Sequence, residues 1–338
     1  MACKMLFFDY RESEEKFFEN FKSDNYDIKF FKKSLNELTV SELTEDELEN
    51  TMIISVYTDS KINDNVISKF KNLRLISTRS TGHDHIDINC CIRKNIALIN
   101  VDTYGTTAKA QFAFGMILLL VRKYCLACKA ENNPLIPKNF CGRDLNALTL
   151  GVIGTGTVGS SVCKYAKCFG MNIVAYDVAP NRKLVEDYGV EYLQIDELLK
   201  KSDIVLLLIS YTKDNYKKFS YDEFKLMKQD SYFINVARGE FVDNDALLEV
   251  AKTGKFAGIG LDVVACMNKK ALDKSQQNVT SNSCIETSQT IKDLLKLPNV
   301  IITPNMSSDT QESVDYILKS TFEGLGEFLT GGRKNRIY

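Results

Sequence analysis

Apolar and polar positions alternate in blocks along the first hundred residues of the chain. Short apolar runs typical of buried strands are separated by amphipathic or acidic segments typical of helices. The expected strands are 3–10, 28–31, 52–57, 73–80 and 96–101, with helices around 17–21, 42–50 and 64–71. Strands that alternate with helices indicate a parallel sheet covered on both faces. This region is therefore predicted to be a small α/β domain of its own.

The same alternation resumes near residue 148 and continues to the end of the chain. The expected strands are 148–153, 173–176, 204–209, 232–236 and a run within 297–305, with helices at 182–188, 195–201 and 243–253. Residues 266–290 are polar and show little pattern, which predicts a surface loop. The last helix, 313–329, is expected to pack back against the first domain.

A glycine motif follows the strand predicted at 148–153. Gly154, Gly156 and Gly159 form G-x-G-x-x-G at the start of a helix, and the next strand ends in Asp177, 177 − 159 = 18 residues further on. Glycines at these positions permit a tight turn, close approach of a pyrophosphate to the main chain, and close packing of helix on strand. The helix start attracts phosphate, and the acidic residue reaches ribose hydroxyls. The spacing predicts dinucleotide binding, with NAD favoured over NADP because Asp177 repels a 2′-phosphate.

A long helix is predicted from Thr106 or Thr107 to Ala130, with apolar residues on most of its circumference. Such a helix must be covered by the fold or by a partner subunit, and a homodimer contact is favoured here. Cys125 and Cys128 form C-x-x-C late in this helix. Without a second cysteine pair at ligand spacing, small buried helix residues are a better interpretation than a zinc or redox site.

Composition excludes several other classes of function. Lys and Arg total 43 against 44 Asp and Glu, so the net charge of −1 gives no field for nucleic acid. Lys109, Gln111 and Arg122 bracket the apolar patch at 118–121 within less than the length of a membrane span. Ten cysteines and an N-terminus that soon turns acidic favour a reducing, cytoplasmic location.

A glycine-centred loop, STGHDHID at 80–87, directly follows a predicted strand, where open α/β sheets place ligands. It contains both histidines of the chain, His83 and His85. These two imidazoles are candidates for proton transfer near neutral pH.

Several of these segments together resemble the D-isomer-specific 2-hydroxyacid dehydrogenase family, nearest to its D-lactate dehydrogenase branch. The segments are STRSTGHDHID, NVDTY, GVIGTGTVG, VAYDVAPN, SDIVLLL, INVARGEFVDNDALLEVAKTGKFAGIGLDV and LPNVIITP. The resemblance covers roughly residues 50–330. It implies two Rossmann-like domains with doubly wound parallel sheets: a substrate domain of 1–102 and 305–338, and an inserted NAD domain of 103–304. It also implies a homodimer through the helix after Tyr104.

The resemblance implies a set of cofactor-binding positions. The pyrophosphate loop corresponds to Gly154, Gly156, Thr157, Val158 and Gly159, and the ribose ligand to Asp177. The residues that line the adenosine and nicotinamide pocket correspond to Ile209, Ser210, Val236 and Ala237, although the family usually has proline where Ser210 stands. Asp262 corresponds to an aspartate that contacts the nicotinamide amide. No metal is implied.

The substrate positions implied by the resemblance are Thr81, Gly82, Tyr104 and Arg238. Main-chain N–H groups of Thr81 and Gly82 would hold the substrate carboxylate, and Tyr104 would face the substrate. The chemistry also calls for Arg238, because a guanidinium can pair with a planar 2-oxo acid and stabilise the charge that develops as hydride arrives.

The chain departs from the family at its acid–base pair. Asn305 stands where the family has its proton-donating histidine, and Met267 where it has the partner glutamate. An amide can donate a hydrogen bond to a ketone oxygen but does not deliver a proton near neutral pH. General acid catalysis is typically worth about 10²–10⁴-fold in rate. The candidate substitutes are His83, with His85, Tyr104 and Glu286 as further possibilities.

Two hypotheses follow from these residues. In the first, the protein is an NAD-dependent oxidoreductase that reduces a small 2-oxo acid to a D-2-hydroxy acid, either slowly or with a relocated proton donor. In the second, it is a catalytically silent NAD-binding regulatory protein of the same fold. The retained Arg238, Tyr104 and Gly82 favour the enzyme.

Overall fold

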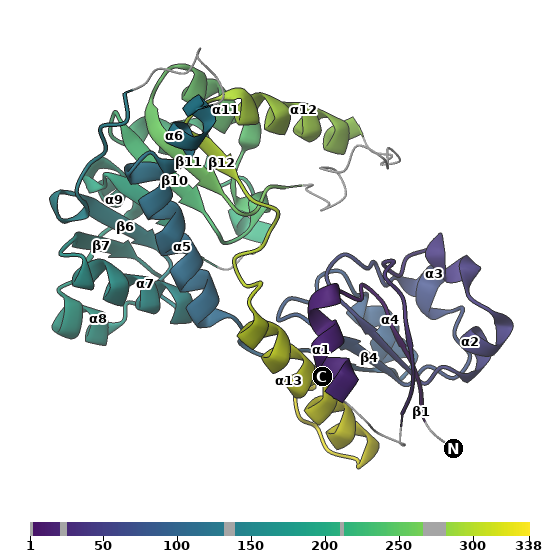
Figure 1. Ribbon diagram of the computed structural model, residues 1–338. Coiled ribbons are helices and arrows are strands. Elements are labelled where there is room, and N and C mark those ends of the chain that lie inside the picture. The colour runs from purple at the N-terminus through teal and green to yellow at the C-terminus, as the bar shows by residue number, and fades with distance from the viewer. Residues whose placement is uncertain (1–2, 21–25, 132–138, 210–212, 266–281) are drawn as a thin grey trace. The chain divides into compact units, whose positions relative to one another are not determined.

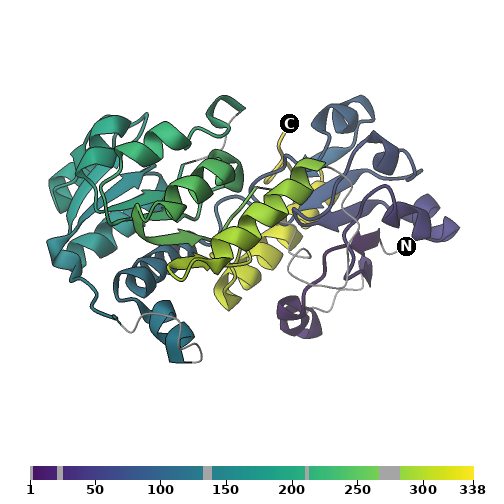
Figure 2. The same ribbon diagram turned by 90° about the horizontal axis from the view of Figure 1, so that it is seen from above.

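The computed structural model describes residues 3–20, 26–131, 139–209, 213–265 and 282–338 (Figure 1, and Figure 2 from above). The chain divides into two compact units. Unit 1 comprises Met1–Gly105 with Asp309–Tyr338, and unit 2 comprises Thr106–Ser308. Each unit has its own sheet and its own hydrophobic core.

Unit 1 contains a five-stranded parallel sheet in the order β2-β1-β3-β4-β5. Its strands are β1 (Cys3–Phe7), β2 (Tyr26–Phe30), β3 (Ile53–Val56), β4 (Leu75–Thr78) and β5 (Ala97–Ile99). Each overlaps an apolar run that predicted a strand. All residues of β3, β4 and β5 are buried, as expected for strands of a parallel sheet covered on both faces.

Helices cover both faces of this sheet. Met5 and Phe7 face α1 (Glu15–Asn20) and α13 (Gln311–Leu329), with Phe7 stacked on Phe322 at 5.8 Å between ring centroids. Leu6 and Phe8, which alternate with them, face a core shared with α2 (Glu45–Asn50), α3 (Asp64–Ile67) and α4 (Ile88–Arg93). The prediction that the C-terminal helix packs on the first domain is confirmed, and Figure 1 shows α13 beside α1.

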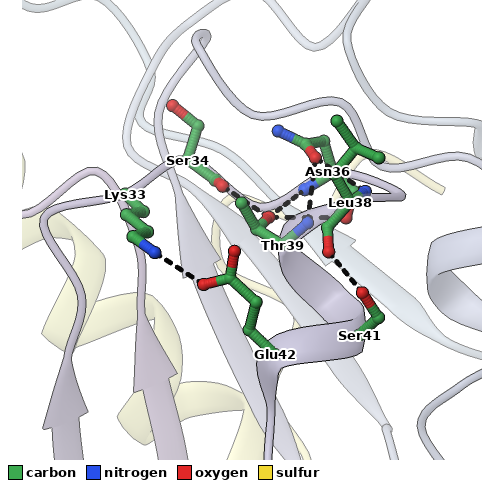
Figure 3. A network of polar contacts seen from close by, with 7 residues as sticks. All are labelled: Lys33, Ser34, Asn36, Leu38, Thr39, Ser41 and Glu42. Atoms are coloured by element: carbon green, nitrogen blue, oxygen red, sulfur yellow. Dashed lines mark hydrogen bonds and ion pairs between the residues drawn. The ribbon is translucent and has the colours of Figure 1, made fainter.

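The segment between β2 and α2 is held by its own polar side chains (Figure 3). Asn36 Oδ1 accepts hydrogen bonds from the N–H groups of Leu38 and Thr39, at 2.9 and 3.1 Å. Lys33 pairs with Glu42 at 2.6 Å across the turn. Because these bonds satisfy the backbone locally, the segment forms a single 3₁₀ turn, Thr39–Glu42, before α2.

Unit 2 contains a seven-stranded parallel sheet in the order β12-β11-β10-β9-β6-β7-β8. Its strands are β6 (Thr149–Ile153), β7 (Asn172–Tyr176), β8 (Glu191–Tyr192), β9 (Ile204–Leu207), β10 (Ser231–Asn235), β11 (Phe256–Leu261) and β12 (Val300–Ile302). The chain runs outward from β6 through β7 to β8, and then resumes at β9 on the other side. This reversal between β6 and β9 is the point where doubly wound sheets bind ligands.

Both faces of the second sheet are covered by helices, which confirms the predicted doubly wound α/β fold. One face carries α5 (Thr106–Val121), α7 (Thr157–Cys168) and α8 (Arg182–Tyr188). The other carries α9 (Ile195–Lys201), α10 (Tyr221–Leu226), α11 (Asn244–Lys252) and α12 (Asn282–Lys296). Figure 1 shows α5 and α7 on the first face and α11 and α12 on the second.

The single long helix predicted from Thr106 to Ala130 is wrong. It is two helices, because α5 ends at Val121, Lys123 has a left-handed φ of 54°, and α6 (Tyr124–Glu131) begins after a 55° bend. A periodic pattern alone does not report one residue with positive φ. In the part of the chain that the structure describes, no single helix is long and apolar enough to cross a bilayer, and α5 with α6 meets that length and composition only as a bent pair.

The last nine residues of the polar segment predicted as a loop are helical. Residues 282–290 begin α12, whose buried Ile291 and Leu294 pack on the core of unit 2. The apolar contacts that stabilise this helix come after the polar stretch, so the stretch itself shows no amphipathic pattern. Residues 266–281 of the predicted loop lie outside the described residues.

Candidate active site

The β6–α7 crossover brings bare main chain to the carboxyl edge of the second sheet. Gly154 has a φ of +101°, and a Cβ on Gly159 would lie 2.0 Å from the carbonyl oxygen of Gly154. A Cβ on Gly156 would meet nothing within 4 Å, so this side of the loop is open. α7 begins at Thr157, and the first N–H groups of a helix have no intrahelical acceptor. Open backbone donors at a helix start fit the pyrophosphate of a dinucleotide.

Asp177 directly follows β7 and lies beside this crossover. Its Oδ2 accepts hydrogen bonds from the N–H of Thr155 at 2.6 Å and the hydroxyl of Thr155 at 3.1 Å, and its Oδ1 accepts one from the N–H of Ala179 at 2.9 Å. Burial alone would raise the pKa of Asp177, but the hydrogen bonds from Ala179 and Thr155 outweigh burial and lower it below 3.8. The carboxylate therefore stays charged and fixed beside the glycine loop.

Two residues of this network were not found by sequence reasoning. The hydroxyl of Tyr192 donates to Thr155 Oγ1 at 2.9 Å and accepts from the N–H of Asn181 at 3.0 Å. Thr155 thus connects β8 to Asp177. It lies inside the glycine motif, which is the only sequence signal for its role.

A cavity of about 210 Å³ lies beside Asp177. Its lining residues are Tyr176, Asp177, Pro180, Tyr192, Leu193, Gln194 and Glu197. Two of these residues are acidic and none is basic. A group with a 2′-phosphate would meet only negative charge in this cavity.

The residues expected to line the cofactor pocket have different environments. Ile209 is half-buried, and a Cβ on Gly154 would lie 2.7 Å from its Cγ2, so it packs directly under the glycine loop. Val236 is buried in the core that α5 and α7 share, and Ala237 packs on the opposite core. Ser210 lies outside the described residues.

Arg238 stands in the turn that follows β10. The buried side chain of Asn235 fixes this turn, because its Oδ1 accepts from the N–H of Ala237 at 3.0 Å and its Nδ2 donates to the carbonyl of Arg238 at 2.9 Å. A Cβ on Gly239 would lie 2.1 Å from the N of Ala265, so the chain after β11 closes over the turn. Arg238 is half-buried, and its guanidinium forms no ion pair within the described ranges. Sequence reasoning missed Asn235.

Asp262 and Asn305 are brought together at the ends of β11 and β12. The buried carboxylate of Asp262 accepts hydrogen bonds from Thr303 Oγ1 at 2.7 Å and from the N–H groups of Met306 and Ser307, both at 2.9 Å. The N–H of Asn305 donates to the carbonyl of Asp262 at 2.9 Å. Asp262 therefore positions the loop of Asn305, and its expected contact with nicotinamide stays a prediction. Met267 lies outside the described residues.

Asn305 itself is exposed and has a φ of 51°, a left-handed conformation that asparagine tolerates better than most residues. An exposed amide here can still donate a hydrogen bond to a ligand. An amide gives up no proton near neutral pH, so Asn305 is not an acid.

In unit 1, the loop after β4 carries the expected carboxylate-binding positions. The hydroxyl of Thr81 donates to the carbonyl of Val101 at 3.1 Å, and the carbonyl of Gly82 accepts from Ser80 Oγ at 2.7 Å. Within the described residues, the N–H groups of Thr81 and Gly82 donate to no protein acceptor. These two N–H groups are thus available to an anionic ligand.

The candidate proton donors of unit 1 are held within the fold. His83 is half-buried, and its Nδ1 is buried without a hydrogen-bond partner in the described part of the chain. His85 is also half-buried, with its Nε2 3.1 Å from Thr78 Oγ1. Tyr104 packs in a small apolar cluster with Tyr57, Val101 and Ile317. The side chain of Glu286 lies outside what the structure describes.

A fully buried ion pair lies at the carboxyl edge of the first sheet and was not predicted. Arg79 directly follows β4, and its Nε lies 3.2 Å from Glu14 Oε1, with both side chains fully buried. Its Nη1 donates to Ser55 Oγ at 2.8 Å and its Nη2 to the carbonyl of Phe8 at 2.6 Å. The guanidinium also lies over the ring of Tyr57, 4.3 Å from the ring centroid. In the sequence, the only hint of a role for Arg79 is that it lies within the STRSTG segment.

Two other features lie away from these residues. Cys125 and Cys128 are both on α6, but Cys128 is exposed, so the predicted burial is wrong for that residue. Among the described His, Cys, Asp and Glu residues, no group of three or more could hold a metal ion. A larger cavity of about 420 Å³ lies at the amino edge of the first sheet, where Arg74 and Ala97 precede or begin strands, rather than at the ligand edge.

The glycine crossover, the doubly wound sheet and the acidic end of β7 define a dinucleotide-binding α/β protein. Residues 114–307, more than half of the chain, match the family model of the D-isomer specific 2-hydroxyacid dehydrogenase, NAD binding domain. The chain belongs to this family of oxidoreductases, and its cofactor is NAD. The resemblance drawn from the sequence is confirmed.

Individual relatives agree with this assignment. An aromatic 2-oxoacid reductase of Clostridium sporogenes is 34% identical over 291 residues, covering 84% of this chain and 85% of that protein. A D-lactate dehydrogenase of Lactiplantibacillus plantarum is 28% identical over 340 residues, covering 98% and 97%. Among solved structures, D-lactate dehydrogenase from Aquifex aeolicus complexed with NAD and lactic acid aligns with a TM-score of 0.84 at 33% identity, covering 98% of each chain.

Proposed function

We propose that the protein is an NAD-dependent oxidoreductase that transfers hydride between NADH and a small 2-oxo acid, giving a D-2-hydroxy acid as a D-lactate dehydrogenase does. The observation that carries the proposal is Arg238, which Asn235 fixes at the same sheet edge as the glycine crossover. A half-buried guanidinium without an acidic partner among the described residues can pair with the carboxylate and carbonyl of a 2-oxo acid.

The remaining site residues take roles that suit their chemistry. When bound, NAD supplies or accepts the hydride. Gly154, Gly156 and Gly159, with the N–H groups of Thr157 and Val158, hold the pyrophosphate. Asp177 binds the ribose hydroxyls. Ile209, Ser210, Val236, Ala237 and Asp262 shape the pocket of the nicotinamide and adenosine.

In unit 1, the N–H groups of Thr81 and Gly82 hold the substrate carboxylate, and Tyr104 faces the substrate. Unit 1 is then the substrate domain and unit 2 the NAD domain. NAD is favoured over NADP because Asp177 and Glu197 leave no counter-charge for a 2′-phosphate.

Replacement of the acid–base pair makes the reaction either slow or dependent on another proton donor. Asn305 and Met267 lack the proton chemistry of a histidine and a glutamate. The same replacement is the observation that favours the second candidate, a catalytically silent NAD-binding regulatory protein. The two differ in one respect, which is whether bound NADH is consumed.

The test follows NADH absorbance with pyruvate, glyoxylate and an aromatic 2-oxo acid, chosen because relatives are named for these substrate classes. We expect turnover with at least one acid, and a loss of about 10²–10³-fold in kcat/KM for Arg238→Ala, as for removal of one charge-stabilising donor. Arg143→Ala is the matched control, because that exposed arginine pairs with Asp203 away from the site. NADH binding without turnover of any acid would favour the silent protein instead.

We also propose a homodimer through the helix after Tyr104, in the cytoplasm. The fold covers one side of α5, burying residues such as Ala113 and Ile117. Phe112 and Leu118 are only half-buried, and Leu119 is 38% exposed. These apolar side chains are suited to a second copy of the chain. Sedimentation velocity tests the proposal, since a monomer at micromolar concentration would contradict it.

A further inference from the structure

Lys109 lies near the start of α5, on the stripe of this helix that faces β11. The helix runs against the strand: a Cβ on Gly258 would lie 3.0 Å from Leu120 Cδ2, and a Cβ on Gly260 would lie 2.4 Å from Met116 Sδ. Lys109, Ala113, Met116 and Leu120 follow the i, i+4, i+7, i+11 spacing of one helix face.

This direction carries Lys109 past the end of the strand. From Met116 to Lys109 a helix advances about 10 Å, and from Gly260 to Val263 a strand advances about the same distance. Helical side chains also lean toward the helix start. The register therefore places the Lys109 side chain at the carboxyl edge of the sheet, at the level of Val263, the residue after Asp262.

The charges around Lys109 agree with this placement. Lys109 is half-buried, and burial lowers the pKa of its ammonium below 10.5. The nearby positive charge of Arg238 lowers the pKa further, whereas the carboxylate of Asp262 raises it. All three residues belong to unit 2. A half-buried lysine whose charge is opposed by the proposed substrate arginine is unusual, because like charges disfavour the charged form of the ammonium.

Two other elements packed on α5, α7 and β10, contribute neutral side chains against this helix. α7 contributes Tyr165, which lies against Phe114, and Cys163, whose burial raises its pKa to about 12 and keeps it neutral. β10 contributes Tyr232, which lies at the far end of the helix near Gly258. The charged groups that act on Lys109 thus include Arg238 and Asp262, both at the candidate site.

Asp262 also connects Lys109 to the position of the missing histidine. Its carboxylate accepts from the N–H groups of Met306 and Ser307, and its carbonyl accepts from the N–H of Asn305. Asp262 thus holds the loop of residue 305 by hydrogen bonds and also acts on the charge of Lys109.

We propose that Lys109 is the proton donor of the reduction, in place of the histidine that Asn305 replaces. This inference rests on the proposed function. As the carbonyl carbon of the 2-oxo acid gains the hydride, the carbonyl π pair moves to oxygen, which takes a proton from the Lys109 ammonium. The product is a neutral hydroxyl and a neutral amine, and the amine regains its proton from water.

The geometry gives each neighbour a part in this step. Arg238 holds the carboxylate of the acid. Its positive charge also makes Lys109 a better proton donor, because it disfavours the charged ammonium. Asn305 can donate a hydrogen bond to the same oxygen but keeps its protons. An ordinary exposed lysine would hold its proton too tightly to transfer it near neutral pH.

The first test compares Lys109→Met with Lys164→Met, the same substitution at an exposed lysine of α7. We expect Lys109→Met to bind NADH within about threefold of the unchanged protein, by fluorescence titration, while kcat for 2-oxo acid reduction falls about 10²–10⁴-fold. Lys164→Met should match the unchanged protein in both measurements.

A second test does not depend on activity. Brief labelling with acetic anhydride across pH, read by mass spectrometry, reports the neutral fraction of each lysine. Lys109 should become reactive at lower pH than Lys164, and oxamate with NADH should protect it. Lys109→Arg, which keeps the charge but does not release a proton, should bind NADH yet lose the decline in kcat that the unchanged protein shows as pH rises.

These outcomes separate the two proposals. If the unchanged protein reduces a 2-oxo acid and Lys109→Met keeps both its rate and its pH profile, Lys109 is not the donor and the proposed function stands. If the unchanged protein binds NADH but reduces no 2-oxo acid, the proposed function fails, and the donor role fails with it. Labelling of Lys109 at the same pH as Lys164 would also overturn the donor role.

Discussion

The two sheets of this protein use their carboxyl edges in opposite ways. At the edge of the first sheet, side chains fill the space: Arg79 and Glu14 form a fully buried ion pair, and Asp9 accepts from Ser60 at 2.7 Å. At the edge of the second sheet, the β6–α7 turn is bare main chain, open on the side of Gly156. In both units, the carboxyl edge is the place where open α/β sheets bind ligands.

The difference shows what each edge is built to do. Side chains that satisfy one another stabilise the first unit but leave few groups for a ligand, apart from the loop at Thr81 and Gly82. Backbone donors without protein acceptors do little for stability and are free to bind phosphate. Substitutions at the first edge should therefore change stability, and substitutions at the second should change binding.

The largest expected effect is on the stability of the first edge. Glu14→Gln leaves the Arg79 guanidinium buried without its counter-charge, which should lower the free energy of unfolding by about 3–5 kcal/mol. Glu12→Gln, two residues earlier, removes the partner of an exposed pair with Lys32 and should cost about 0–1 kcal/mol. Urea unfolding followed by circular dichroism measures both. Equal destabilisation by the two changes would show that the buried pair contributes no more than a surface pair.

The sequence predicted the second edge far better than the first. The glycine crossover could be predicted because its backbone geometry restricts the residue type at Gly154, Gly156 and Gly159. The spacing of these glycines is therefore visible in the sequence. The pairing of Arg79 with Glu14 depends on how residues far apart in the chain meet in space. No local pattern reports such a contact.

The same reason explains the residues that were missed within unit 2. Asn235 and Tyr192 act through hydrogen bonds to main chain and to Thr155, and neither has an unusual spacing. In the sequence, Lys109 is visible only as a charge that brackets the apolar patch of a predicted helix. Its position relative to Asp262 follows from the packing of α5 on β11, which the sequence does not give.

A smaller effect is expected at the second edge, on binding alone. A Cβ on Gly156 meets no protein atom within 4 Å, so Gly156→Ala should unfold at the same temperature as the unchanged protein. The added methyl group occupies the side that the pyrophosphate must approach, and the Kd for NADH should rise at least tenfold, or about 1.4 kcal/mol. Calorimetric titration with NADH and a thermal unfolding scan measure the two quantities.

Gly159→Ala is the informative contrast, because its Cβ would lie 2.0 Å from the carbonyl oxygen of Gly154. It should lose both thermal stability and NADH binding. If Gly156→Ala also lowered the unfolding temperature, the open side of the loop would be structural, and the division of roles between the two edges would not hold.

The smallest effect concerns Asp177, a side chain at the second edge that hydrogen bonds hold in place. Hydrogen bonds from Ala179 and Thr155 outweigh burial and lower the pKa of Asp177. The stability that Asp177 contributes is therefore complete above pH 3.8 and is lost as pH falls through its lower folded-state pKa.

Thr155→Val removes the hydroxyl that donates to Asp177 and accepts from Tyr192. This change should raise the pKa of Asp177 and weaken NADH binding by about 0.5–1.5 kcal/mol. Thr253→Val is the control, because the hydroxyl of Thr253 donates to the carbonyl of Val250 at the end of α11. Unfolding midpoints between pH 2 and 6 should differ between the two variants above about pH 3.8 and converge toward the acid end, because the lost contribution exists only while the carboxylate is charged. A difference that stayed constant across this range would mean that Thr155 acts through packing rather than through the charge of Asp177.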